Sequence, residues 1–202
     1  MWIQIASYAL CAVVAAAPAA AFAQARSVEF ADLVTALLVP VGAESNQPSW
    51  TSITHPSIHW KSTGPHPASA WLAEDGLPMS RTGTVVITVS GKPTHEHEGN
   101  LPGQWELTLA GTSAHPTEAR IDIDKPAAIG FEPVEALRAR GFAVKALCEP
   151  GGISSGAAVY TVEAPGFKPV TMSHEWSGGS AGTSVGVELA YASSRAATKQ
   201  CE

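Results

Sequence analysis

Charged residues, cysteines and basic runs are all scarce in this chain of 202 residues. Charged residues make up only 15% of it, the formal net charge is −6, and the lysines and arginines are scattered. Nucleic acid and anionic membranes are therefore poor candidates as partners. The sequence also has no P-loop, dinucleotide-binding glycine fingerprint, C-x-x-C pair or H-E-x-x-H motif. Because no catalytic set can be recognised, we expect a protein that is not an enzyme.

The apolar run at the start of the chain predicts export. Tyr8 to Ala23 is small and apolar and ends in Ala21-Phe22-Ala23, the pattern of a signal-peptidase site. A membrane anchor fits less well, because Pro18 interrupts a run already short of the ~20 residues that span a bilayer. A lipidated Cys11 fits less well still, because Tyr8-Ala9-Leu10 lacks the small residue expected immediately before a lipoprotein cysteine. We expect a cleaved signal peptide over residues 1–23 and a soluble periplasmic or secreted protein.

Only three cysteines occur, and one of them, Cys11, would leave with the signal peptide. The remaining pair, Cys148 and Cys201, is predicted to form a disulfide, as even pairs in exported chains usually do. This disulfide would close a loop of about 54 residues and would stabilise the fold by roughly 4 kcal/mol. The alternative is two free thiols that act as metal ligands.

Two helices are expected. Apolar residues at helical spacing between Val28 and Val39, with Ser27 as N-cap, predict the first. Pro133–Arg140 predicts the second, with Gly141 as its C-cap and Phe142 packing behind it. The irregular stretch 62–79 has room for one further helical turn at Ala68–Glu74.

Alternating apolar residues predict strands in both halves of the chain. In the first half they surround Ile58, Ile87, Leu107 and Ile121, and we expect the last of these strands at a sheet edge. The strands expected in the second half contain the following apolar residues: Ala158, Tyr160 and Val162; Val170, Met172 and Trp176; Val185, Val187 and Leu189.

Gly83–Leu109 and Gly156–Tyr191 resemble one another in the order of their short motifs. The matched pairs are Lys92-Pro93 with Lys168-Pro169, His97-Glu98 with His174-Glu175, and Glu106-Leu107 with Glu188-Leu189. We therefore predict an α+β fold with antiparallel sheet or sheets and two helices, built as a tandem repeat of a helix-plus-β-meander unit. The expected units are residues 24–124 and 125–202, arranged either as two lobes or on one sheet.

The strongest metal-binding pattern is His95-Glu96-His97. In an extended chain the two imidazoles lie on one face, and neutral imidazole suits Zn and Cu. If the repeat holds, His174 lies nearby, with Glu175 or His115 as a further ligand. The competing interpretation is a solvated hairpin tip at His95–Glu98 and a packed, hydrogen-bonded His174.

Tryptophans are concentrated in the irregular part of the first half. Trp50, Trp60 and Trp71 have histidines nearby, and aromatic anchors with polar neighbours are typical of binding surfaces. Core packing is the alternative interpretation, and we prefer it for Trp105 and Trp176.

Gly178-Gly179-Ser180-Ala181-Gly182 matches the nucleophile-elbow pattern of hydrolases, but a strand is expected after it and no histidine follows Ser180. A flexible hairpin loop is the better interpretation.

The sequence thus favours an exported, soluble, non-enzymatic protein without a cofactor, a binding or inhibitor-type module. Its expected partner is another macromolecule of the cell envelope, such as a protein. The alternative is a small exported metal-binding protein that uses the His-x-His site for Zn or Cu. An unrecognised hydrolase ranks third.

Overall fold

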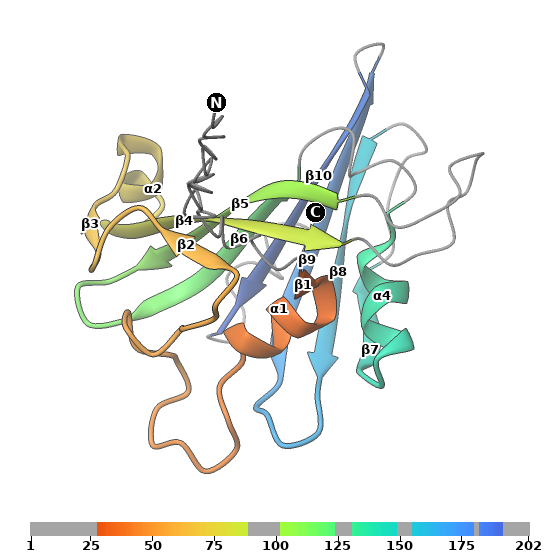
Figure 1. Cartoon of the computed structure of the whole chain (residues 1–202), viewed down its shortest axis with the longest axis horizontal. Helices are drawn as coiled ribbons and strands as arrows, with labels where there is room; N and C mark the ends of the chain where they lie inside the picture. The colour runs from red at the N-terminus through yellow and green to blue at the C-terminus, as the bar shows by residue number, and fades with distance from the viewer. Residues whose placement is uncertain (1–27, 89–101, 124–130, 149–154, 180–181, 192–202) are drawn as a thin grey trace, which may run out of the picture.

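In the part of the chain that the structure describes, ten strands form one mixed sheet (Figure 1). The computed structural model describes residues 28–88, 102–123, 131–148, 155–179 and 182–191. The strands are β1 (Val28–Glu29), β2 (Ile58–Trp60), β3 (His66–Pro67), β4 (Met79–Thr88), β5 (Pro102–Gly111), β6 (Pro116–Ile123), β7 (Ala143–Cys148), β8 (Ser155–Glu163), β9 (Val170–Gly179) and β10 (Gly182–Ala190). The helices within these ranges are α1 (Phe30–Leu37), α2 (Ala70–Glu74) and α4 (Pro133–Ala139).

The strand order is β1-β4-β5-β6-β10-β9-β8-β7. β1, β2 and β3 share one edge of β4: β1 pairs near Ile87, β2 near Thr84 and β3 near Ser80. The β1–β4 pair is parallel, and the other pairs are antiparallel. β6 and β10 pair in the middle, so both halves of the chain contribute to one continuous sheet.

The predicted fold class needs correction. The α+β content and the antiparallel pairing are seen, but the expected architecture of two helices on repeated antiparallel meanders is wrong. The described residues form three short helices on one mixed sheet. The parallel β1–β4 pair was not predicted, because two residues give no periodicity to recognise.

The tandem repeat fails for a topological reason. Glu106-Leu107 lies on β5, directly beside the strand β4 that contains Gly83. The matched Glu188-Leu189 lies on β10, which β9 separates from the strand β8 that contains Gly156. The matched motifs therefore occupy strands that are not equivalent, and their common order along the chain does not indicate a common unit.

One face of the sheet, which we call the inner face, packs against the helices. Cross-strand neighbours Val85, Trp105, Ile123 and Val185 lie on it in one row. Together with buried side chains of α1 and α4 they form a single apolar cluster. The two helices lie beside one another (Figure 1), and Arg140 after α4 donates a hydrogen bond of 2.6 Å to Asp32 of α1.

Both predicted helices exist, with shorter bounds than expected. α1 begins at Phe30, because Val28 and Glu29 pair with β4, and Glu29 rather than Ser27 is the residue that precedes the helix. α4 ends as predicted: Gly141 has a positive φ of 85°, and its N–H donates to the carbonyl of Arg138. α2 corresponds to the predicted helical turn at 68–74.

β6 is not the edge strand we expected, since it pairs with β5 on one side and β10 on the other. Its alternating polar residues suggested an edge, but they mark the second face of the sheet, on which Arg120 and Asp122 are 34% and 48% exposed.

The β5–β6 hairpin depends on the absence of a side chain at Gly111. A Cβ at this position would lie 2.5 Å from the carbonyl oxygen of His115 and 2.6 Å from the backbone of Pro116. Because backbone has to move, we expect Gly111→Ala to lower the free energy of unfolding by about 1–3 kcal/mol in urea titrations. Gly64→Ala is the control, because a Cβ there meets nothing within 4 Å. Equal effects of the two substitutions would contradict the close approach.

Candidate functional site

The second face of the sheet, the outer face, is polar. Because side chains alternate along each strand, the neighbours of the buried inner-face residues project to this side. Most of them are only partly buried. The register places the following residues on the outer face: Thr108 of β5; Glu118, Arg120 and Asp122 of β6; Gly186 and Glu188 of β10; and Glu175 of β9.

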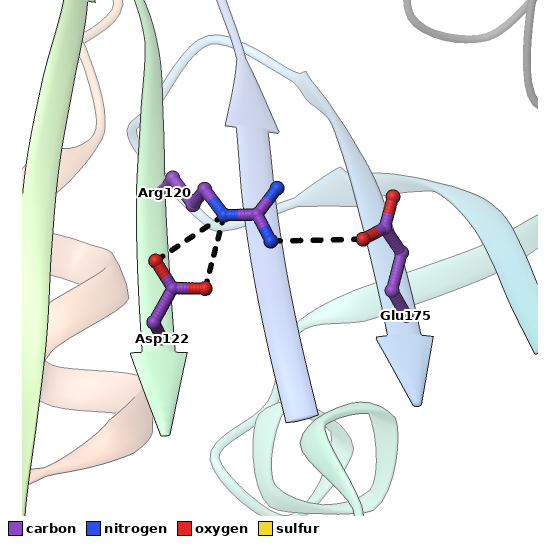
Figure 2. A network of polar contacts seen from close by, with 3 residues as sticks. All are labelled: Arg120, Asp122 and Glu175. Atoms are coloured by element: carbon purple, nitrogen blue, oxygen red, sulfur yellow. Dashed lines mark hydrogen bonds and ion pairs between the residues drawn. The ribbon is translucent and has the colours of Figure 1, made fainter. Parts of the chain in front are cut away.

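Arg120 is the centre of the outer face (Figure 2). Its Nε donates to both carboxylate oxygens of Asp122, at 3.0 and 3.2 Å. Its Nη2 lies 3.7 Å from Oε2 of Glu175. The three side chains are 34%, 48% and 43% exposed, respectively. One guanidinium therefore links β6 to β9 in a fixed, partly solvated arrangement.

Gly186 makes this arrangement possible. The Arg120 side chain crosses β10, the strand that lies between β6 and β9 (Figure 2). A Cβ at Gly186 would lie 3.2 Å from Nη2 of Arg120. Beside the guanidinium is a depression of about 500 Å³, and Ala157 and Ser177 contribute to its lining. Because Gly186 has no side chain, the guanidinium group of Arg120 can lie close to the backbone of β10.

Glu118 and Glu188 occupy the same face near Arg120. Burial, followed by repulsion from Glu188, raises the pKa of Glu118 from 4.5 to about 7, although Arg120 opposes the shift. Burial also raises the pKa of Glu188, with attraction to Arg120 opposing it and repulsion from Glu175 adding to it. The carboxylate of Asp75, just after α2, repels both groups. The outer face therefore has an unfavourable excess of negative charge.

We expect Glu118→Gln to raise stability at alkaline pH. The pKa of Glu118 is higher in the folded protein than in the unfolded one, so protonation of Glu118 stabilises the fold. This contribution is fully present below pH 4.5 and is lost as the pH rises through about 7. The neutral amide avoids that loss. After a discount for solvent screening, the variant should be about 1–2 kcal/mol more stable than wild type at pH 8 in urea unfolding.

The matched control is Glu106→Gln, also on the outer face. Glu106 is 52% exposed and pairs with Lys61 at 3.2 Å. A surface pair of this kind contributes under about 1 kcal/mol. A Glu118→Gln variant that is less stable than wild type at pH 8 would contradict the charge excess.

Two of the three tryptophans predicted to bind a partner are packed against the protein. Trp50 is 6% exposed, and its Nε1 donates to the carbonyl of Thr112 at 3.2 Å. Arg81 stacks on Trp60, with its Cζ 4.2 Å from the ring centroid. Arg81 also donates to the carbonyl of Trp50 at 2.6 Å. Both rings therefore fix the segment around β2 to the sheet, and their role in binding stays a prediction.

Trp71 lies apart from them on α2 and is 57% exposed. Leu72 is the residue by which this short helix is buried. Of the three tryptophans, Trp71 is the one whose ring is open to a partner.

The proposed metal ligands are only partly placed. His95 and His97 lie outside the described residues. His174 is on the inner face, 8% exposed, with its ring centroid 5.2 Å from that of Trp176. Its Nε2 is buried and has no hydrogen-bond partner among the described residues. The packing of His174 therefore agrees with the competing interpretation, and its hydrogen bond stays a prediction. Within the ranges described above, no group of three or more His, Cys, Asp or Glu side chains is placed to hold a metal ion. The Zn or Cu hypothesis stays a prediction.

The remaining sequence predictions concern residues that the structure describes only in part. Cys148 ends β7 and is not a free thiol, but Cys201 lies outside the described residues, so their pairing stays a prediction. Ser180 also lies outside them; Gly179 ends β9 and Gly182 begins β10, so strands flank the elbow-like motif on both sides. The predicted signal peptide is likewise not described.

The sequence interpretation overlooked Arg120, Glu118 and Glu188 as a site. The alternation of Glu118, Arg120 and Asp122 with apolar residues marks a solvent-facing side of a strand, and that was the available signal. Their proximity to Glu175 and Glu188 depends on the register of β6, β10 and β9, which no local pattern specifies.

None of the helices in the described part of the chain is long and apolar enough to span a membrane. Comparison of the chain with models of protein families, with curated proteins and with solved structures finds no match.

Proposed function

We propose that this chain is an exported, non-enzymatic binding or inhibitor-type module that recognises another macromolecule of the cell envelope through the outer face of its sheet. The observation that carries this proposal is the charged centre of Arg120, Asp122 and Glu175. These side chains are held by strands β6 and β9 of the sheet and are partly exposed. They lie beside a depression of about 500 Å³.

The packing of the sheet supports this choice of surface. The inner face is occupied by α1 and α4, whose buried side chains belong to the apolar cluster. The outer face instead holds charged side chains at fixed register. Functional groups on regular strands are positioned more accurately than groups on loops, so a partner meets a preorganised polar pattern and the ordering cost of binding is small.

The proposal is tested by photo-crosslinking in the producing cell. A photoreactive amino acid replaces Thr108 on the outer face in one variant and Ala139, an exposed residue on α4, in the other. We expect a discrete crosslinked partner from position 108 and none from position 139. Crosslinks from position 139 alone would show that the helical side is the binding surface, and no partner from either position would overturn the binding function.

Export is the second part of the proposal, and the apolar run ending in Ala21-Phe22-Ala23 supports it. The expected intact mass of the purified protein is that of a chain beginning at Gln24. A full-length mass, with the protein retained in the cytoplasm, would contradict export.

A further inference from the structure

We propose that the depression beside Arg120 binds a neutral, polyhydroxylated ligand, namely a polysaccharide chain of the cell envelope. Arg120, Asp122 and Glu175 would hold its hydroxyl groups, and Gly186 and Ala157 would lie under a sugar ring. This inference rests on the proposed binding function and specifies the chemistry of the partner.

The guanidinium group of Arg120 retains donors for a ligand. Within the described ranges both of its hydrogen bonds start from Nε and reach Asp122. Its Nη2 lies 3.7 Å from Oε2 of Glu175, which is longer than a hydrogen bond. The other terminal amino group points at neither carboxylate (Figure 2). Because a guanidinium has five N–H donors, both terminal amino groups can donate to a ligand in the depression, which Arg120 lines.

The separation between Nη2 of Arg120 and Glu175 suits a bridging hydroxyl group. A hydroxyl oxygen accepts a hydrogen bond from an N–H, and its own proton can be donated to a carboxylate. One hydroxyl between the two groups would therefore replace a long contact by two charge-assisted hydrogen bonds. A second hydroxyl, on the neighbouring carbon atom, can reach the other amino group or Asp122. Hydroxyls on neighbouring carbon atoms are characteristic of sugars.

The mixed charge of the lining disfavours charged ligands. The guanidinium of Arg120 lies between the carboxylates of Asp122 and Glu175, and all three side chains line the depression (Figure 2). A phosphate or carboxylate ligand would meet the two carboxylates, and an ammonium ligand would meet the guanidinium. A neutral hydroxyl group avoids both repulsions and uses the same three groups as hydrogen-bond partners.

Small side chains lie between and beside these charged groups. Gly186 pairs with Asp122 on one side and with Glu175 on the other, and Ala157 is the next residue across from Glu175. Neither Gly186 nor Ala157 has a polar side-chain atom, so the C–H face of a sugar ring can lie against them. The volume of about 500 Å³ falls within the range of about 300–1,000 Å³ usual for small-ligand sites. The depression therefore has room for a short segment of a longer chain.

The test uses an array of neutral oligosaccharides built from glucose, galactose, mannose and N-acetylglucosamine. The same array contains the four single sugars and acidic oligosaccharides that contain uronate or sulfate. The full mature chain should bind at least one neutral oligosaccharide, the single sugars more weakly, and none of the acidic ones. Binding of no neutral oligosaccharide, or only of acidic ones, would overturn the inference. Equally strong binding of a single sugar would show that a chain is not recognised.

Variants connect this binding to the depression. Arg120→Gln should weaken binding of the strongest array ligand about tenfold or more in calorimetry. Gly186→Ala keeps every charge but places a Cβ 3.2 Å from Nη2 of Arg120, and should weaken binding about fivefold or more. The matched control is Arg140→Gln, because Arg140 also contacts one aspartate and one glutamate, Asp32 and Glu29, but lies beside the helices. Its affinity should stay within about twofold of wild type.

Circular dichroism and urea unfolding show whether each variant is folded. If Arg120→Gln does not fold, Gly186→Ala decides, because it leaves the charged groups in place. Wild-type affinity in a folded Arg120→Gln or in Gly186→Ala would contradict the assignment of the site.

Ionic strength separates a neutral ligand from a charged one. Salt screens interactions between charges, so the affinity for a neutral chain should change less than about twofold between 0.05 and 0.5 M salt, a range over which the Debye length falls by about a factor of three. A steep loss of affinity with added salt would show that a charged ligand is bound.

The outcome for the proposed function is read separately, from the partner crosslinked at position 108 in the cell. Periodate cleaves neighbouring hydroxyl-bearing carbons, so a polysaccharide partner should be degraded by periodate and resist protease. If the partner is instead degraded by protease alone, the binding function stands and the polysaccharide is wrong. If the array test succeeds but position 108 crosslinks to nothing, the depression binds sugars without the proposed physiological partner.

Discussion

Trp105→Ala is expected to lower the free energy of unfolding by about 3–5 kcal/mol. Trp105 is 1% exposed on the inner face of β5. Its ring centroid lies 5.8 Å from that of Phe30 and 5.4 Å from that of Phe131, and these two rings are 5.2 Å apart. The substitution removes the member that joins this aromatic cluster to the sheet and leaves a cavity that α1 cannot fill. Urea unfolding followed by circular dichroism measures the loss.

Trp71→Ala is the matched control, because the same side chain is lost from a position that is 57% exposed. We expect a change within about 0.5 kcal/mol. A loss below about 1 kcal/mol for Trp105→Ala would mean that the aromatic cluster is not the packing centre described here.

Acidification is expected to destabilise the protein through His174. Burial among apolar side chains lowers the pKa of His174 from 6.5 to about 4. The unfolded chain therefore takes up a proton at higher pH than the folded one. The stability linked to His174 is fully present above pH 6.5 and decreases as pH falls toward 4, by about 3 kcal/mol in total.

The measurement has to isolate His174, because Glu118 contributes with the opposite sign over a similar pH range. The comparison is wild type against His174→Leu, which keeps an apolar side chain in the core and removes the titration. The stability of wild type relative to this variant should fall by about 3 kcal/mol between pH 7 and pH 4. A difference that does not change with pH would show that His174 is solvated or donates a hydrogen bond that stabilises its charged form.

Local patterns in the sequence predicted the elements and failed on their arrangement. The alternation around Ile87, Leu107 and Val187 corresponds to inner-face residues of β4, β5 and β10, because burial on one face imposes a period of two. α4 was predictable for a similar reason, since Pro133, the apolar spacing and Gly141 all act within one helix. Strand order depends instead on contacts between distant segments.

Tryptophans and charged residues show the same distinction. Trp50 and Trp60 were predicted as binding anchors from their local surroundings, and that role stays a prediction. No local pattern indicates that Arg81, 31 positions from Trp50, holds both against the protein. No local pattern distinguished Glu118 and Glu188 from other polar strand residues, and the β6–β10 register makes them diagonal neighbours. The alternation of polar and apolar residues along a strand indicates which of its faces is exposed to solvent. Only the register between strands shows which charged residues lie together on that face.

The β6–β10 pair also governs how the chain can fold. β6 ends at Ile123, and its second partner begins at Gly182, so nearly sixty residues separate the two along the chain. At synthesis rates of about 5–20 residues per second, β6 waits for several seconds with an unpaired edge. Its free N–H and C=O groups can pair with other chains during that time. Completion of the sheet is therefore a late, non-local step, which slows folding and makes incomplete chains prone to aggregation.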